Sequence, residues 1–151
     1  MRSTLLVSLA VAIAIAGSPL AGNAQQTRVF RIGVLEPAHL ADANYDAFRE
    51  GLRGLGYVEG QNIVLEWRLA EGRYDRLPDL AADLVRRRVD VIVADSTPGI
   101  QAAKQATATI PVVMVASADP VGTGLVKSLA RPGGNVTGLS MFTAELSGKR
   151  L

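Results

Sequence analysis

The chain has 151 residues, of which 48% are hydrophobic and 20% charged, so it holds one domain and is too apolar to be disordered. It has no cysteine, which excludes disulfides, thiolate nucleophiles and Cys-ligated metals. The formal net charge is +2 and the longest basic run is Arg86-Arg87-Arg88, so nucleic acid is not expected as a partner.

Residues 1–24 have the three-part layout of a secretory signal peptide. Arg2 supplies the positive start, residues 5–16 form an apolar run, and small residues precede a cleavage site after Ala24. The apolar run is shorter than the roughly 20 residues that span a bilayer, although an uncleaved membrane anchor is the alternative. We therefore expect a mature chain of residues 25–151 that lies outside the cytoplasm.

The first half of the mature chain predicts two strands separated by a helix. Residues 29–35 form an apolar strand, which a loop connects to a helix capped by Asp42 or Asn44. This helix carries one apolar face at helical spacing and ends at Gly56, a residue free to adopt a left-handed conformation. Residues 63–69 alternate apolar and polar side chains, as edge strands do.

The second half continues this alternation and completes an α/β pattern. Strands 89–94 and 110–116 are nearly continuous apolar runs, which are typical of central strands in a parallel sheet. The other expected elements are a helix capped by Asp75 and ending at Arg88, helices over 98–108 and 119–129, a strand over 136–140 and a helix from 145 to 151. Right-handed crossovers then predict a doubly wound parallel five-stranded sheet of order 2-1-3-4-5, with the alternating strand at its edge.

Ligands of such sheets bind at the carboxyl ends of the strands, where the strand order reverses. Two loops there place a capping residue before a proline, and we expect both Ser96-Thr97-Pro98 and Asp119-Pro120 to begin helices. The free N–H groups of the helix that Thr97 begins would hold a carboxylate, while Asp119 would meet an amino group. Ordinary helix capping is the alternative at both places. The candidate ligand contacts are Ser96, Thr97, Ser117 and Asp119, with Glu36, His39 and Tyr45 as weaker candidates.

Motifs for catalysis and for cofactors are missing. Neither a dinucleotide fingerprint nor a P-loop occurs, and His39 is the only histidine, so no His cluster can hold zinc. Asp95 ends the third strand, where receiver domains carry their phospho-acceptor, but only Glu36 stands where that site uses an acidic pair. We expect no catalytic residue, no metal and no cofactor. A flavodoxin-like enzyme or receiver domain that uses Asp95 is the alternative.

Four segments resemble the ABC transporter substrate-binding proteins related to the tryptophan/tyrosine-type periplasmic binding proteins. They are GLRGLGYVEGQNI at 51–63, DRLP at 75–78, DPVGTGLV at 119–126 and LARPGGNVTG at 129–138. The resemblance runs from about Arg31 to Leu151, and its most specific part is the run from Arg131 to Gly138.

The resemblance implies a type I periplasmic binding fold, in which two α/β lobes enclose a ligand. It also implies capture of a small solute, an aromatic amino acid in some members, and its delivery to an ABC permease in the membrane, without catalysis. Members usually carry both lobes, and residues 25–151 correspond to the N-terminal lobe. We therefore expect a chain truncated to its first lobe, and a non-functional truncated product is a further alternative.

Overall fold

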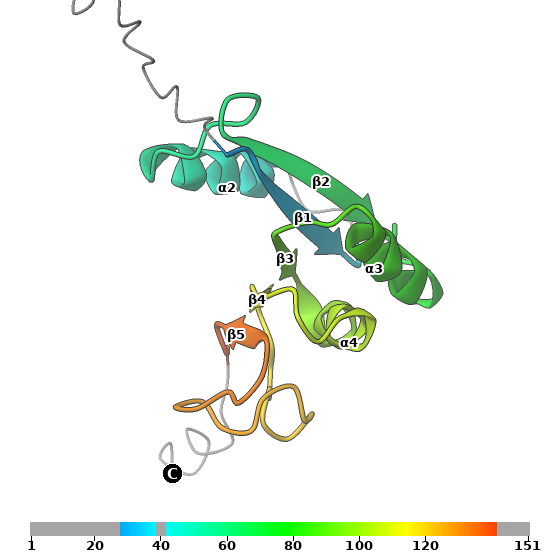
Figure 1. Cartoon of the computed structure of the whole chain (residues 1–151). Helices are drawn as coiled ribbons and strands as arrows, with labels where there is room; N and C mark the ends of the chain where they lie inside the picture. The colour runs from blue at the N-terminus through cyan, green and yellow to red at the C-terminus, as the bar shows by residue number, and fades with distance from the viewer. Residues whose placement is uncertain (1–27, 39–41, 142–151) are drawn as a thin grey trace, which may run out of the picture.

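The computed structural model describes residues 28–38 and 42–141, which build a five-stranded parallel sheet of order β2-β1-β3-β4-β5 (Figure 1). The strands are β1 Phe30–Glu36, β2 Ile63–Leu69, β3 Val91–Ala94, β4 Val112–Met114 and β5 Val136–Gly138. The helices are α2 Asp42–Gly54, the short 3-10 helix η1 Tyr74–Arg76, α3 Leu77–Arg86 and α4 Ser96–Ala106. The predicted fold class, the strand order and the edge position of β2 are confirmed.

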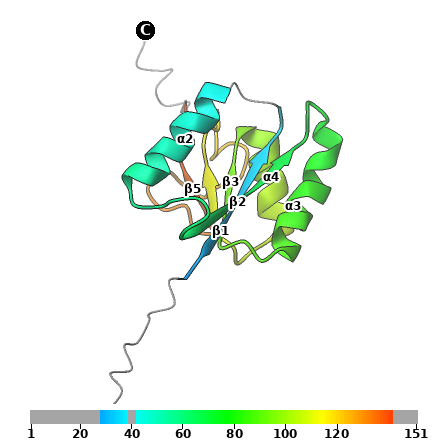
Figure 2. The ribbon, with the colours of Figure 1, turned by 90° about the horizontal axis from the view of Figure 1, so that it is seen from above.

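Helices cover both faces of the sheet, with α2 on one side and α3 and α4 on the other (Figure 2). Because side chains alternate along a strand, each face has its own apolar cluster. The larger cluster lies under α3 and α4 and is built around Leu35, Leu84 and Ile92, which are fully buried. The smaller cluster lies on the α2 side; it contains Ile32, Val34, Ile63 and Leu65, with Phe48, Leu52 and Trp67 packed against it.

Arginine side chains at the C-terminal end of α3 form ion pairs with acidic residues nearby. The Asp83 carboxylate accepts hydrogen bonds from Arg68 of β2 at 2.6 and 2.8 Å, from Arg87 at 3.0 Å and from Arg86 at 3.0 Å. These guanidinium groups, Arg68 foremost, lower the pKa of Asp83 to about 2. Arg87 also pairs with Glu66 at 3.4 Å. Arg86 and Arg87 of the arginine run thus form ion pairs with acidic residues of the same chain at the end of α3.

Several predicted boundaries move by a few residues. Strands β3, β4 and β5 are shorter than predicted, and β5 ends at Gly138, whose φ of 133° does not continue an extended strand. Asp75 does not cap a helix: it lies inside η1, and α3 begins two residues later with Pro78 in its first turn. Helix α4 begins at Ser96 instead of Pro98. The helix predicted over 145–151 lies outside the described residues.

The helix predicted over 119–129 is wrong, because this segment forms turns. The Asp119 carboxylate accepts the N–H of Gly122 at 2.8 Å, and the chain then reverses at Gly124, whose φ is 70°. The N–H of Val126 returns to the carbonyl of Pro120 at 3.0 Å, which closes the loop. Two glycines in three residues weaken a helix, and the positive φ at the second ends it. The apolar spacing of the segment instead buries Leu125 and Val126 in the larger cluster.

Replacing Gly122 by alanine is expected to lower the free energy of unfolding by roughly 1–2 kcal/mol. A Cβ at this position would stand 2.0 Å from Oδ2 of Asp119, so the side chain that closes the turn would have to move. Urea denaturation measures the effect, and Asp119→Ala provides the control background. In that background the additional cost of Gly122→Ala should shrink to near zero, whereas two costs that simply add would contradict this account.

Within the described ranges, no helix is long and apolar enough to cross a membrane.

Candidate functional site

Two carboxylates lie side by side at the carboxyl edge of the sheet, where the strand order reverses between β1 and β3. The register pairs Leu35 with Ala94, so Glu36 and Asp95 each follow one residue later. The N–H of Asp95 donates to the carbonyl of Leu35 at 3.2 Å, which fixes this placement. Side-chain alternation turns Leu35 and Ala94 toward α3 and α4, and it turns Glu36 and Asp95 toward the α2 side. Such a switch point is the common ligand position of doubly wound sheets.

Three aromatic rings gather beside these carboxylates. Tyr45 and Phe48 lie one turn apart on α2, and Trp67 extends from the core-facing side of β2. The ring of Trp67 lies 4.8 Å from that of Tyr45 and 6.1 Å from that of Phe48, both nearly perpendicular. Edge-to-face contacts of this kind are favourable, and the Arg49 guanidinium, 5.4 Å from the Trp67 ring centre, adds a cation–π contact. The indole is therefore held in one orientation.

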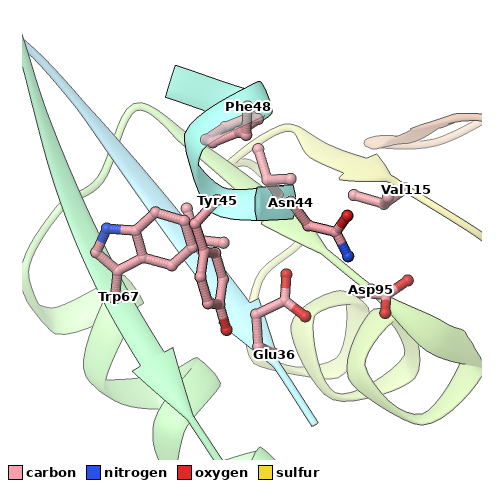
Figure 3. Close-up of a pocket in the computed structure, with 9 residues that line it drawn as sticks. Glu36, Asn44, Tyr45, Phe48, Trp67, Asp95 and Val115 are labelled. Carbon is pink, nitrogen blue, oxygen red and sulfur yellow. The ribbon is translucent and has the colours of Figure 1, made fainter. Parts of the chain in front are cut away.

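The carboxylates and rings enclose a cavity of about 230 Å³ (Figure 3). The Trp67, Tyr45 and Phe48 rings stand on one side of it, and the polar groups of Glu36 and Asp95 stand on the other. Its complete lining is Val34, Glu36, Asn44, Tyr45, Phe48, Trp67, Val93, Asp95 and Val115. The volume lies below the roughly 300–1,000 Å³ of pockets for drug-sized ligands, so the cavity suits a small solute with an apolar body and a polar end.

Glu36 dominates the electrostatics of the cavity. Its side chain belongs to a residue that is only 3% exposed, and its Oε2 has no hydrogen-bond partner. Burial, together with the smaller effect of the negative charge of Asp95, raises the pKa of Glu36 from its ordinary 4.5 to about 7. The Asp95 carboxylate makes no capping hydrogen bond to α4, although Asp95 is its N-cap residue. The cavity therefore offers two carboxyl groups to a positively charged or hydrogen-bond-donating group.

Two hydroxyl groups at the same edge of the sheet are buried without a hydrogen-bond partner. They are Oγ of Ser96, in the first turn of α4, and Oγ of Ser117, in the loop after β4, a residue that is 1% exposed. Ser96 also has a φ of 59°, which is uncommon for a residue other than glycine and costs conformational energy. Strained backbone and unsatisfied polar groups concentrate at binding sites.

The predicted site residues do not all meet in the cavity. Glu36 and Tyr45 line it, whereas Ser96 and Thr97 lie in the first turn of α4 and Ser117 lies in the loop after β4, at the same edge of the sheet. The Asp119 carboxylate is hydrogen-bonded to Gly122 within its own turn. His39 lies outside the described residues. Within those described, no group of three His, Asp or Glu side chains could hold a metal ion.

The sequence reasoning missed Asn44, Phe48 and Trp67 as cavity residues. Phe48 lies on the apolar face of its helix, and Trp67 is one of the apolar residues in the alternating strand; both pack against the smaller apolar cluster. A signal that could have found this site is the single tryptophan of the chain, which lies close to the carboxyl end of β2.

Solved structures of similar sequence share this architecture. A substrate-binding protein with adhesive properties from Clostridium difficile, in its ligand-free open form, is 35% identical with a TM-score of 0.73; the match covers 82% of this chain and 42% of that one. An ABC domain from Streptococcus pneumonia, solved in complex with L-Trp, is 35% identical with a TM-score of 0.69; the match covers 74% of this chain and 38% of that one.

Curated sequences and family profiles agree with these structures. A tyrosine-binding protein of Clostridioides difficile (strain R20291) is 44% identical over 95 residues, which are 63% of this chain and 28% of the relative. The chain thus spans less than half the length of the relatives it matches. The family model described as ABC transporter substrate binding protein matches residues 32–149. Together with the shared fold, this match shows that the chain belongs to the family of ABC transporter substrate-binding proteins.

Proposed function

We propose that this chain provides one lobe of a periplasmic solute-binding protein that captures an aromatic amino acid for import by an ABC permease. The observation that carries this proposal is the cavity at the switch point, which combines three aromatic rings with two carboxyl groups. The proposal is supported by two relatives, one called a tyrosine-binding protein and one solved with L-Trp.

Different parts of the cavity and its surroundings suit the ring, the ammonium group and the carboxylate of such a ligand. Its aromatic ring would pack against Trp67 and Tyr45, where apolar and edge-to-face contacts are available. Its ammonium group would lie at Glu36 and Asp95, which takes over the role that the sequence suggested for Asp119. Its carboxylate would lie toward the N-terminal turn of α4, where Ser96, Thr97 and Ser117 offer hydroxyl and N–H donors.

Export and a second lobe complete the proposal. Residues 1–24 would direct secretion and be removed after Ala24, so the mature chain would begin at Gln25. A second lobe would close over the cavity and exclude water, as in hinged binding proteins. Val115, at the rim of the cavity, is 43% exposed, which is consistent with an opposing surface that is not part of this sheet. One lobe alone supplies half of the contacts, so its affinity would be much weaker than that of a two-lobe relative.

Addition of L-tyrosine is expected to change the fluorescence of Trp67 saturably, because the only tryptophan of the chain lines the proposed site. Excitation at the red edge of the indole band avoids signal from tyrosine itself. Tyr45→Ala should weaken the binding about tenfold, the equivalent of roughly 1.4 kcal/mol. Tyr74→Ala is the matched control, because Tyr74 is 54% exposed in η1 and does not line the cavity. A titration without saturation, or equal losses in both variants, would count against the proposed site.

A further inference from the structure

The buried carboxyl group of Glu36 restricts which ligands the cavity can bind, in addition to the restriction that the cavity shape imposes. Its Oε2 has no hydrogen-bond partner, and the residue is 3% exposed. The titratable groups that line the cavity with it are Tyr45 from α2 and Asp95 from the end of β3. Trp67 from β2 and Val115, which directly follows β4, line the cavity without a charge. Among the described residues, no arginine or lysine forms an ion pair with Glu36.

We propose that Glu36 holds a proton in the empty site and releases it when the ammonium group of a ligand arrives. This inference rests on the proposed function and adds that the recognised group is a cation whose capture is linked to pH. In the step, the O–H bond of the Glu36 carboxyl breaks and its proton passes to solvent. The carboxylate then accepts N–H···O hydrogen bonds from the ammonium, which keeps its charge and its protons.

The physical reason is that the empty cavity offers Glu36 no compensation for a negative charge. Burial disfavours the ionised carboxyl, and the adjacent Asp95 carboxylate repels it, so the pKa of Glu36 lies at about 7 instead of its ordinary 4.5. A cation placed between the two carboxylates reverses both effects. The faces of the surrounding rings add attraction for the same cation. An aromatic acid without an amine would bring a third negative charge and would be disfavoured.

Ligand affinity should therefore depend on pH in a direction that identifies the mechanism. Below pH 7, each lower pH unit protonates Glu36 further and weakens the binding of an amine by up to about tenfold. Between about pH 7.5 and pH 5.5, the dissociation constant for an aromatic amine should rise about 20-fold. An aromatic carboxylate without an amine should show the opposite trend.

The experiment titrates the chain with three probes and follows Trp67 fluorescence at both pH values. The probes are L-tyrosine, tyramine and 3-(4-hydroxyphenyl)propionate, which carry the same ring with both charges, the amine alone and the carboxylate alone. L-tyrosine and tyramine should show the 20-fold dependence, and Glu36→Gln should remove it. Glu50→Gln, an exposed position on α2, is the matched control and should retain it. Asp95→Asn should move the midpoint toward lower pH without abolishing it, because burial contributes more than Asp95.

A second measurement needs no ligand. The side-chain carboxyl carbon of Glu36, followed by NMR in the ligand-free chain, should titrate near pH 7, and a midpoint below pH 5 would overturn the inference. Binding of L-tyrosine with equal affinity at both pH values would also overturn it, while the proposed function would stand. If neither L-tyrosine nor tyramine binds at either pH, both the proposed function and this inference are rejected. A midpoint near pH 7 would then show only that Glu36 is a buried acid with a raised pKa.

Discussion

Replacing Gly138 by alanine is expected to lower the free energy of unfolding by about 3 kcal/mol or more and to detach β5 from the sheet. Gly138 has a φ of 133°, and a Cβ there would stand 2.3 Å from the carbonyl oxygen and 2.6 Å from the nitrogen of Met114. Both atoms belong to the backbone of β4, so no side-chain rotation can relieve the contact. The strand would have to move away from its neighbour.

Loss of β5 would also disturb the loop after β4. The N–H of Leu139 donates to Met114 at 3.1 Å, and the N–H of Met141 donates to Ser117 at 2.9 Å, so the residues after Gly138 help to hold that loop. Denaturant unfolding with amide hydrogen exchange measures both effects. Gly134→Ala is the control, because nothing lies within 4 Å of a Cβ at that position. Equal stability losses in the two variants would contradict the account.

Replacing Glu36 by glutamine is expected to stabilise the ligand-free chain at alkaline pH and to change little at about pH 5. The folded chain holds the Glu36 proton more tightly than the unfolded chain, because its pKa is raised from 4.5 to about 7. The stability of the unsubstituted chain should therefore fall as pH rises through this window and stay lower above it. The difference approaches at most about 3 kcal/mol above pH 8, and glutamine avoids it because it carries no charge.

Thermal or urea unfolding at several pH values tests this expectation. The control is Glu50→Gln, which removes one carboxyl from the exposed surface of α2 and should keep the pH profile of the unsubstituted chain. Parallel profiles for the unsubstituted chain and Glu36→Gln would show that the buried carboxyl does not carry the proposed proton.

The sequence predicted the architecture well because the sheet obeys simple periodicities. The alternation over Ile63–Leu69 placed β2 at the edge, and the apolar runs placed β3 and β4 in the middle. The helix predicted over 119–129 is wrong for a local reason. The apolar spacing of that segment fits a helix, but Gly122 and Gly124 favour a turn that the Asp119 carboxylate closes. The spacing of apolar residues indicates only which side chains are buried. It contains no information on the backbone conformations that glycine favours.

Two of the four segments that carry the family resemblance, 51–63 and 129–138, form loops at the opposite edge of the sheet from the cavity. The Asn62 side chain donates to Gly56 at 2.8 Å and accepts the N–H of Val58 at 2.7 Å, which ties the loop before β2. The Asn135 side chain donates to the carbonyls of Thr107 and Ile110 at 3.0 and 2.8 Å, which anchors the start of β5. These two motifs stabilise loops of the scaffold, so they indicate the fold and not the residues that contact the ligand.

The cavity itself was only partly predictable. Strand alternation fixes that Glu36 faces the α2 side, but the cavity beside it also needs three rings that come from α2 and β2. Tyr45 and Phe48 read equally well as core residues, because a helical stripe has the same spacing whether it packs on the sheet or lines a cavity beside it. The contacts of Tyr45 and Phe48 with Trp67 distinguish a cavity-lining role from a core role. These contacts join residues far apart in the sequence, so no local sequence pattern predicts them.

A structure of the chain with L-tyrosine tests the central claim most directly. The account predicts the tyrosine ring against Trp67 and Tyr45, with its ammonium within hydrogen-bond distance of Glu36 or Asp95. A second groove, at the amino edge of the sheet, is bounded by Arg28, Phe30 and Tyr57 among others and has a volume of about 350 Å³. Tyrosine bound in that groove, or bound at the carboxyl edge with its ammonium turned away from both carboxylates, would contradict the account.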